Sequence, residues 1–349
     1  MLFRWLVVLE VFLLVACGGD TSSNVSAESQ NGIKRDSSLS VDSFTLLMDA
    51  DSIKTLLGSD RFKVVFRNED VGNLVLLDYT GDSVKMTLLA QGMDVYHPTF
   101  SPDGNKVAFS SAFEGASFES KLYILDLRYP EDIDSLDVES AAIPRWYVMD
   151  GDTVIVYVDY SGDDRNERWS SSATWRVSYK GAKFGMPEEI YGRSYNGGLA
   201  YDFSFAATGA SRLFFHKSEA EEFVYEDRYN DQQVCNVSVS RDSSKLISFL
   251  ETAGFMGRDF THDESGIWLR YVFYQDEDGK IVNAIKSFDG TTFEHVEWLD
   301  GIPAQVGILL TKAEYFYDIV LIDYVHSSVH KFIKSEGVSM WTPDLWVER

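Results

Sequence analysis

The chain has 349 residues, of which 45% are hydrophobic and 14% aromatic, enough apolar material for a large buried core. Its formal net charge is -24, from 55 acidic and 31 basic residues. A nucleic-acid-binding protein must neutralise phosphates with Lys and Arg, so this balance excludes that role. It also excludes a polybasic membrane-binding patch.

The N-terminal segment has the organisation of a secretory signal. Its start is weakly positive, and residues 5–15 are almost all apolar but too few to span a bilayer as a helix. The run Leu14-Val15-Ala16-Cys17 that follows resembles a bacterial lipobox. The resemblance implies removal of a signal peptide at 1–16 and lipid attachment to Cys17, and Gly18 in place of Asp implies sorting to the outer membrane. A buried first strand or helix is the alternative.

Residues 17–43 are expected to form a lipidated, flexible tether. They are rich in Ser, Asn, Gly and Asp, and they cannot bury enough apolar surface to offset the entropy of ordering. An ordered strand that pairs into the fold is the alternative. The stretch from Asp49 to Leu57 predicts a short helix ended by Gly58, and one folded domain is expected over residues 44–349.

The rest of the chain predicts an all-β fold. Short β-branched and aromatic segments alternate with Gly, Asp, Asn and Ser turns, and helical periodicity is scarce. Typical segments are 63–66, 74–79, 106–110, 122–126, 154–158, 212–215, 245–249, 268–273 and 319–323.

One unit repeats along this region. In its clearest copy, His97-Pro98-Thr99-Phe100 leads into the turn Ser101-Pro102-Asp103-Gly104 and then into a strand at 106–110. The turn follows from its residues, because Pro presets φ, Asp hydrogen-bonds nearby backbone and Gly accepts positive φ. Weaker copies begin at Ile143, Asp202 and Val239, and the chain ends on Met340–Val347 with a further copy.

This unit resembles the PD40 repeat of TolB-like, WD40-like β-propellers. At about 40–45 residues per blade, the distance from the first full copy to the terminal copy fits six blades, with seven as an alternative. The first and last strands are expected to close one blade together. The chain also resembles paralogous propeller lipoproteins of cellulose-degrading bacteria, which imply little about activity. An ordinary β-sandwich is the competing architecture.

An acidic loop is the best local candidate for a metal site. Asp159, Ser161, Asp163, Asp164 and Glu167 place oxygen atoms at near-alternating positions, as Ca²⁺ requires. The spacing does not match an EF-hand, so a solvated acidic turn is the alternative.

Aromatic side chains and a turn suggest a second candidate site. Trp169, Trp175, Tyr195 and Asn196 are candidate contacts for a protein or glycan partner, since exposed aromatic rings stack on sugars. The alternative is that these aromatic residues belong to the core between blades.

Motifs for catalysis are missing from the sequence: there is no GxSxG elbow, Walker loop or Rossmann glycine pattern. We therefore expect a non-enzymatic, membrane-anchored propeller of the cell envelope that binds a protein, or a cell-envelope or plant glycan, through its blade loops. The alternative is a glycoside hydrolase or lyase with paired carboxylates at the channel. An assembly factor like TolB is a third hypothesis, but too few residues precede the first strand to form the N-terminal α/β domain of that family.

Overall fold

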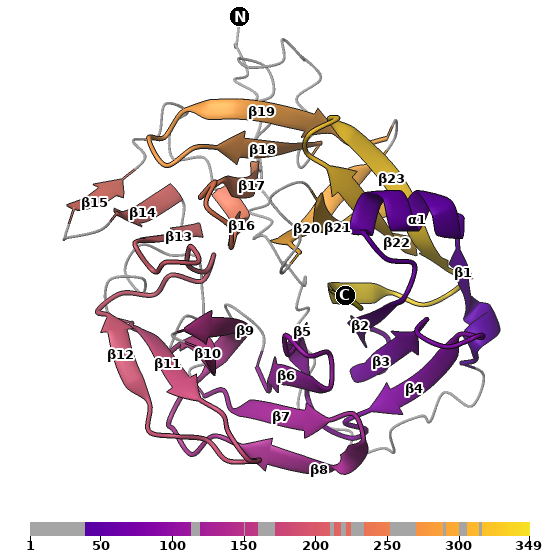
Figure 1. Cartoon of the computed structure of the whole chain (residues 1–349), viewed down its shortest axis with the longest axis horizontal. Coiled ribbons are helices and arrows are strands. Elements are labelled where there is room, and N and C mark those ends of the chain that lie inside the picture. The colour runs from indigo at the N-terminus through magenta and orange to yellow at the C-terminus, as the bar shows by residue number, and fades with distance from the viewer. Residues whose placement is uncertain are drawn as a thin grey trace, which may run out of the picture. The chain divides into compact units, whose positions relative to one another are not determined.

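The computed structural model describes residues 39–112, 119–149, 151–159, 172–209, 213–217, 221–224, 234–251, 270–288, 291–299, 306–313 and 316–349. All of them fall within the unit Ile33–Arg349. They form 24 β-strands, one α-helix, α1 (Ala50–Leu57), and a 3-10 helix, η1 (Val41–Ser43). The strands form sheets arranged radially around a central axis, which confirms the predicted all-β propeller (Figure 1).

Six antiparallel sheets follow one another around the ring, and the strands of each are named in order from the innermost to the outermost. The first contains β24 (Met340–Val347), β2 (Phe62–Asn68), β3 (Asn73–Asp78) and β4 (Lys85–Leu89). The second contains β5 (Tyr96–Phe100), β6 (Lys106–Ser110), β7 (Leu122–Asp126) and β8 (Tyr129–Ser135). The third contains β9 (Ala142–Met149), β10 (Asp152–Val158), β11 (Thr174–Ser178) and β12 (Glu188–Tyr191).

The second half of the ring continues in chain order. The fourth sheet contains β13 (Phe205–Gly209), β14 (Leu213–Lys217) and β15 (Glu221–Val224). The fifth contains β16 (Val234–Val239), β17 (Ile247–Glu251), β18 (Tyr271–Gln275) and β19 (Ile281–Lys286). The sixth contains β20 (Thr292–Trp298), β21 (Val306–Ala313), β22 (Phe316–Asp323), β23 (Ser328–Ser335) and β1 (Phe44–Leu46).

The fourth sheet corrects the prediction of six regular blades. Five sheets have four or five strands, whereas this one has three. Residues 197–200 occupy its inner position and pair irregularly with β13, with the Ala200 N–H donating to Phe205 O at 2.8 Å. The Gly197-Gly198 pair accounts for this, because glycine disfavours a strand and Gly198 has a φ of +86°. The ring thus has five complete blades and one irregular sheet, with no seventh sheet among the described strands.

Both termini of the folded unit close the ring. The C-terminal strand β24 pairs with β2, with Val347 opposite Phe62, so the first and last parts of the repeat region share one blade as expected. The short strand β1 pairs with β23, with Phe44 opposite Ser335, and adds a fifth strand to the last blade. Two separate strand pairings therefore hold the ends of the ring together.

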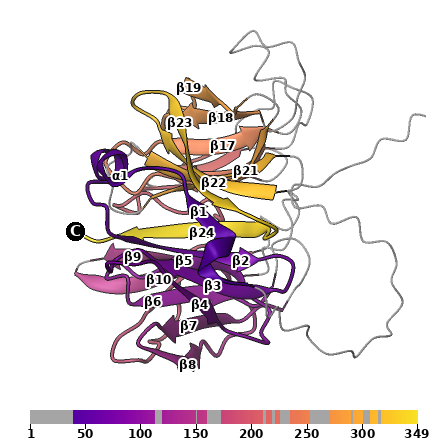
Figure 2. The same cartoon turned by 90° about the vertical axis from the view of Figure 1, so that its right-hand side faces the viewer.

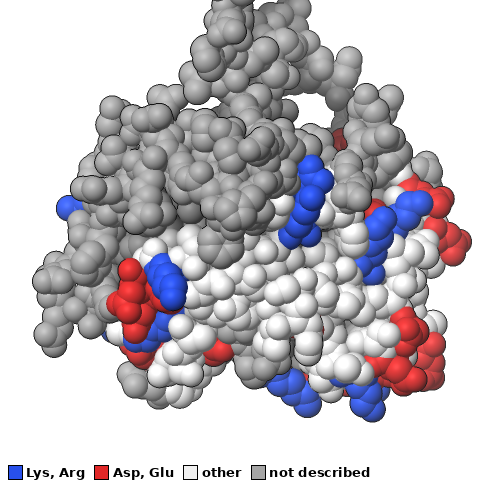
Figure 3. Space-filling model, turned by 90° about the horizontal axis from the view of Figure 1, so that it is seen from above, with Lys and Arg blue, Asp and Glu red and all other residues white. Residues whose placement is uncertain are grey.

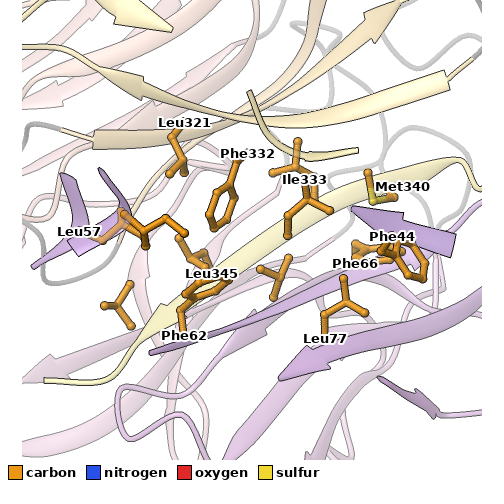
Figure 4. Close-up of a cluster of buried hydrophobic side chains, with 14 of the residues drawn as sticks. Phe44, Leu57, Phe62, Phe66, Leu77, Leu321, Phe332, Ile333, Met340 and Leu345 are labelled. Atoms are coloured by element: carbon orange, nitrogen blue, oxygen red, sulfur yellow. The ribbon is translucent and has the colours of Figure 1, made fainter. Parts of the chain in front are cut away.

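The largest described core cluster lies at this closure. It packs the first sheet against the sixth, with β1 and α1 covering it, and Figure 4 shows its side chains converging from these elements. Its fully buried members include Phe62, Phe66, Phe332 and Met340. Burying a side chain of this size contributes roughly 1.5–3 kcal/mol, so the cluster stabilises the joint between the chain ends.

The predicted helix is confirmed as α1. The Asp49 side chain caps it by accepting the Ser52 N–H at 2.9 Å, and Gly58 ends it with a φ of +84°. The 3-10 helix η1 lies within residues 17–43, so regular structure begins before the expected end of the tether.

The two ends of the ring differ in what they carry. The inner strands finish at the end where the C-terminus lies, on the left in Figure 2, and we call this end the C-terminal face. Because antiparallel strands alternate in direction, the turns after β5 and β9 lie at the C-terminal face. Strands β6 and β10 finish at the opposite end of the ring.

One side of the outer rim has a broad area without charged side chains among the described residues. Seen from the side that bears β19, the described charged side chains surround a broad uncharged area (Figure 3). In the parts of the chain that the structure describes, no helix has the length and hydropathy to cross a membrane.

Candidate functional site

A cavity of about 360 Å³ opens at the C-terminal face, at the mouth of the central channel. Its walls come mainly from β5, β9, β20 and β24, with a contribution from the turn after β16. The titratable side chains among its lining are His97, Arg145, Arg241, His295, Glu297 and Asp344, together with the terminal Arg349. A cavity of this size lies near the lower limit for small-molecule pockets, roughly 300–1,000 Å³.

A shared backbone irregularity shapes these inner strands. His97, Ile143, Asn236 and Thr342 have φ values of 50°, 51°, 50° and 43°, and strand pairing shifts register beside each of them. Positive φ is rare for β-branched residues such as Ile and Thr, and such strain tends to cluster at functional sites. Arg145 and Asp344, each two residues beyond one of these positions, both line the cavity.

An ion pair between Arg145 and Glu297 spans the channel. Arg145 Nη2 donates to Glu297 Oε1, and Arg145 Nη1 donates to Asn196 O. Ser238 Oγ donates to Glu297 Oε2 at 2.8 Å. Burial alone would raise the pKa of Glu297, but Arg145, His295 and the Ser238 hydrogen bond outweigh it and hold this pKa below its usual value. Glu297 is therefore charged and has a partner at each oxygen.

Two imidazoles lie beside this pair. The ring centroids of His97 and His295 are 6.2 Å apart, and His295 Nδ1 lies 3.1 Å from Asn236 Oδ1. Burial, reinforced by His295 and Arg145, lowers the pKa of His97 to about 3, and burial also lowers the pKa of His295. Both rings are neutral at pH 7. They help to line a second cavity of about 20 Å³, enough for one water molecule.

Asp344 is the second carboxyl group of the larger cavity. Its Oδ2 accepts the Phe100 N–H at 2.6 Å, which ties β24 to β5. Burial raises the pKa of Asp344 to about 6, and Glu297 adds to the shift, while the Phe100 hydrogen bond and Arg241 oppose it. Ionising Asp344 at neutral pH therefore costs the folded protein free energy.

Replacing Asp344 with Asn is expected to stabilise the protein by about 3 kcal/mol at pH 7. The folded-state pKa of about 6 exceeds the ordinary value of 3.8. Protonated Asp344 therefore makes its full stabilising contribution below pH 3.8, and this contribution is lost as the pH rises through 6 and the group ionises. Asn keeps an acceptor for Phe100 and removes the charge. Urea unfolding at pH 7 and pH 4 measures the effect, and an equal gain at both pH values would contradict this origin.

Trp346 forms part of the cavity wall and locks the repeated turn in place. Its Nε1 donates to Pro102 O at 3.0 Å, and Lys63 Nζ lies 4.9 Å from the centroid of its ring. Lys63 Nζ also donates to Gly104 O at 2.8 Å. A Cβ atom at Gly104 would lie 2.3 Å from this ring. The indole is thus engaged by the turn and by Lys63, so it acts as structure rather than as a free stacking surface.

The predicted acidic loop begins at the opposite end of the ring. Asp159 follows β10 and accepts hydrogen bonds from the Ala173 N–H and, at 2.8 Å, from Trp175 Nε1. Asp159 and Trp175 thus close the base of this loop. The remaining predicted residues there, Ser161, Asp163, Asp164, Glu167 and Trp169, lie outside the described residues, as does Cys17. The calcium site stays a prediction.

The two residues of the predicted Tyr-Asn turn separate in the structure. Tyr195 is 2% exposed and packs in the core with Tyr147 and Leu199. Asn196 lines the smaller cavity, and its side-chain oxygen accepts the Thr208 hydroxyl. Asn196 therefore lies on the channel, next to the Arg145–Glu297 pair.

Sequence reasoning missed the charged channel residues. Arg145, Glu297 and Asp344 each come from a different blade, so no local motif contains them. One signal was present: Arg145 and Asp344 directly follow Pro144 and Pro343 of the repeat. Within the described residues, no three His, Cys, Asp or Glu side chains come together as a metal site requires.

Comparison with known proteins establishes the fold alone. No family model and no curated protein matches the chain. It is similar to TolB from Acinetobacter baumannii, with a TM-score of 0.52 and 14% identity, covering 82% of this chain and 66% of that one. It is also similar to hydrazine synthase from Kuenenia stuttgartiensis, with a TM-score of 0.52 and 8% identity. This match covers 82% of this chain and 46% of that one. A putative TolB from Agrobacterium tumefaciens has a TM-score of 0.48 and 13% identity, and the match covers 82% of this chain and 97% of that one.

These matches are limited in the share of the matched chains that they cover, as well as in sequence identity. The chain spans less than two thirds of the TolB chain from Acinetobacter baumannii and less than half of the hydrazine synthase chain. What the similarity supports is a β-propeller of the kind seen in TolB.

Proposed function

We propose that the protein is a lipid-anchored β-propeller that binds a partner, either a protein or an envelope glycan, at its C-terminal face. The observation that carries this proposal is the cavity of about 360 Å³ at the channel mouth, lined by positioned charged groups. The chain enters the ring at the opposite end, where Phe44 pairs with Ser335.

Apolar side chains on the same face support this proposal. Among the described residues, five of the seven exposed large hydrophobic side chains lie in or beside turns at this end, and exposed apolar groups favour partner contacts. They are Tyr129, Val148, Met186, Tyr201 and Val325. Loops and turns at the end of a rigid ring suit recognition, because the sheets fix their positions.

Replacing Val148 with Arg tests the proposed surface. Val148 lines the cavity and is 57% exposed, so a long charged side chain there should obstruct the mouth without disturbing the core. We expect at least a tenfold loss of partner captured from solubilised envelopes or of glycan retained on an array. The matched control is Val282→Arg, at a position that is 39% exposed, on the outer strand β19 and outside the cavity. Equal capture by both variants would move the site elsewhere.

Replacing Cys17 with Ser tests the anchor. Removal of the thiol removes the attachment point for the acyl chains, which otherwise hold a protein at the membrane by about 0.8 kcal/mol per buried methylene. The wild-type protein is expected in the membrane pellet, and the variant is expected in the soluble fraction. Retention of the variant in the pellet after a salt wash would show that another part of the chain provides attachment.

A polysaccharide-acting enzyme is the second candidate, and one observation favours it. Glu297 and Asp344 line one cavity with pKa values shifted in opposite directions, as in general acid and base pairs. Release of reducing ends from plant or envelope polysaccharides would detect hydrolysis. Activity lost in both Asp344→Asn and Glu297→Gln would establish the enzyme, whereas binding without turnover would leave the binding function in place.

A further inference from the structure

Asp344 differs in its partners from Glu297, Arg145 and Arg241, three other charged groups of the cavity. Glu297 and Arg145 neutralise one another, and Arg241 donates through Nη1 to Trp146 O at 2.9 Å while its guanidinium lies 4.7 Å from the centroid of the Tyr147 ring. Among the described residues, no Lys, Arg or His lies within ion-pair distance of Asp344, and its side chain accepts a hydrogen bond from the Phe100 N–H.

Arg241 and Glu297, the charged groups that shift the pKa of Asp344, do not balance its charge. Arg241 lowers the pKa of Asp344 and Glu297 raises it, yet burial keeps this pKa well above its ordinary value. The two imidazoles of the cavity are neutral, because their pKa values are lowered. The carboxylate is therefore under-compensated, and a cation in the cavity would relieve this cost.

The remaining walls suit an apolar stem attached to such a cation. Pro98, Pro144 and Pro343 are part of the cavity lining, and Val148 lies at its exposed rim. An alkyl chain gains roughly 25 cal/mol per Å² of apolar surface that it buries. The net charge of -24 also raises the local concentration of cations around the protein.

We propose that this cavity binds an alkylammonium group, with Asp344 as its counter-ion and the proline residues of the lining around its stem. The inference rests on the proposed function only in placing the binding site at this cavity. An ammonium has three donors and no acceptor, which matches a carboxylate that lacks a cationic partner. A free amine, a lysine side chain of a protein and an amino sugar all present this chemistry.

Calorimetric titration at pH 7 with n-pentylamine, 1-pentanol and pentanoate tests the proposal. The folded wild-type protein is expected to bind pentylamine, and Asp344→Asn is expected to weaken this at least tenfold. Asp82→Asn, which removes an exposed turn carboxylate outside the cavity, should bind as the wild type does. At pH 6, binding should release protons, seen as a dependence of the heat on the buffer, because the ammonium favours ionised Asp344.

Several outcomes would overturn the proposal. Tighter binding of pentanoate would identify an anion site, equal binding of pentanol would identify an apolar one, and unchanged amine binding by Asp344→Asn would remove the counter-ion. Titration with Nα-acetyl-lysinamide and glucosamine then separates the protein and glycan sources of the amine.

The outcomes also separate this inference from the proposed function. Partner capture that depends on Val148, without amine binding, would reject only the ligand chemistry. Amine binding without such capture would reject only the partner surface.

Discussion

Replacing Arg145 with Leu is expected to destabilise the fold by about 3 kcal/mol, because it leaves Glu297 in the channel without its cation. The two side chains are 9% and 23% exposed, so solvent compensates little of the lost interaction. The same change leaves Asn196 O without the Nη1 donor of Arg145. Urea denaturation monitored by tryptophan fluorescence measures the loss as a lower midpoint at an unchanged slope.

Replacing both Arg145 and Glu297 separates the free-energy cost of an unpaired charge from the cost of altered packing. The double variant Arg145→Leu/Glu297→Leu has no stranded charge, so it should recover most of the stability lost in the single variant. Ser238 then keeps its hydroxyl but loses Glu297 as an acceptor. If the single and double variants lost the same stability, the cost would come from packing in the channel and not from the isolated carboxylate.

Local sequence signals predicted the features that depend on neighbouring residues. The Ser101–Gly104 turn forms as expected, with the Gly104 N–H donating to Ser101 O at 2.8 Å and Asp103 accepting the Asn105 N–H at 3.1 Å. The helix caps at Asp49 and Gly58 follow the same logic. The closing pair of β24 and β2 was also predictable, because a terminal copy of a repeat leaves an open edge otherwise.

The channel site could not be predicted in the same way. Arg145 and Glu297 are 152 residues apart and meet only because the ring brings β9 and β20 to one axis. The sequence instead drew attention to side chains that are adjacent in the chain, and Tyr195 shows the limit of that approach, since its ring is used by the core. The residue types around Pro144 and Pro343 do not show which following side chains line the cavity. The register shift in each of the two inner strands determines this.

Replacing Gly104 with Ala is expected to cost about 2–4 kcal/mol, from two separate causes. Gly104 has a φ of +64°, which an L residue adopts with strain, and an added Cβ would lie 2.3 Å from two atoms of the Trp346 ring. The ring cannot move freely, because Pro102 O accepts from its Nε1 and Lys63 lies over it. The strain is therefore expected to spread into the closing strand β24.

Gly151 is the matched control for this change. It also has positive φ, +82°, in the turn after an inner strand, but no atom lies within 4 Å of its added Cβ. Gly151→Ala should thus report the backbone cost alone, about 1–2 kcal/mol. The difference between the two variants in urea unfolding measures how firmly Trp346 holds the turn, and hence how tightly β24 closes the ring. Equal losses would mean that the indole moves aside, and that the closure depends on the β24–β2 pairing instead.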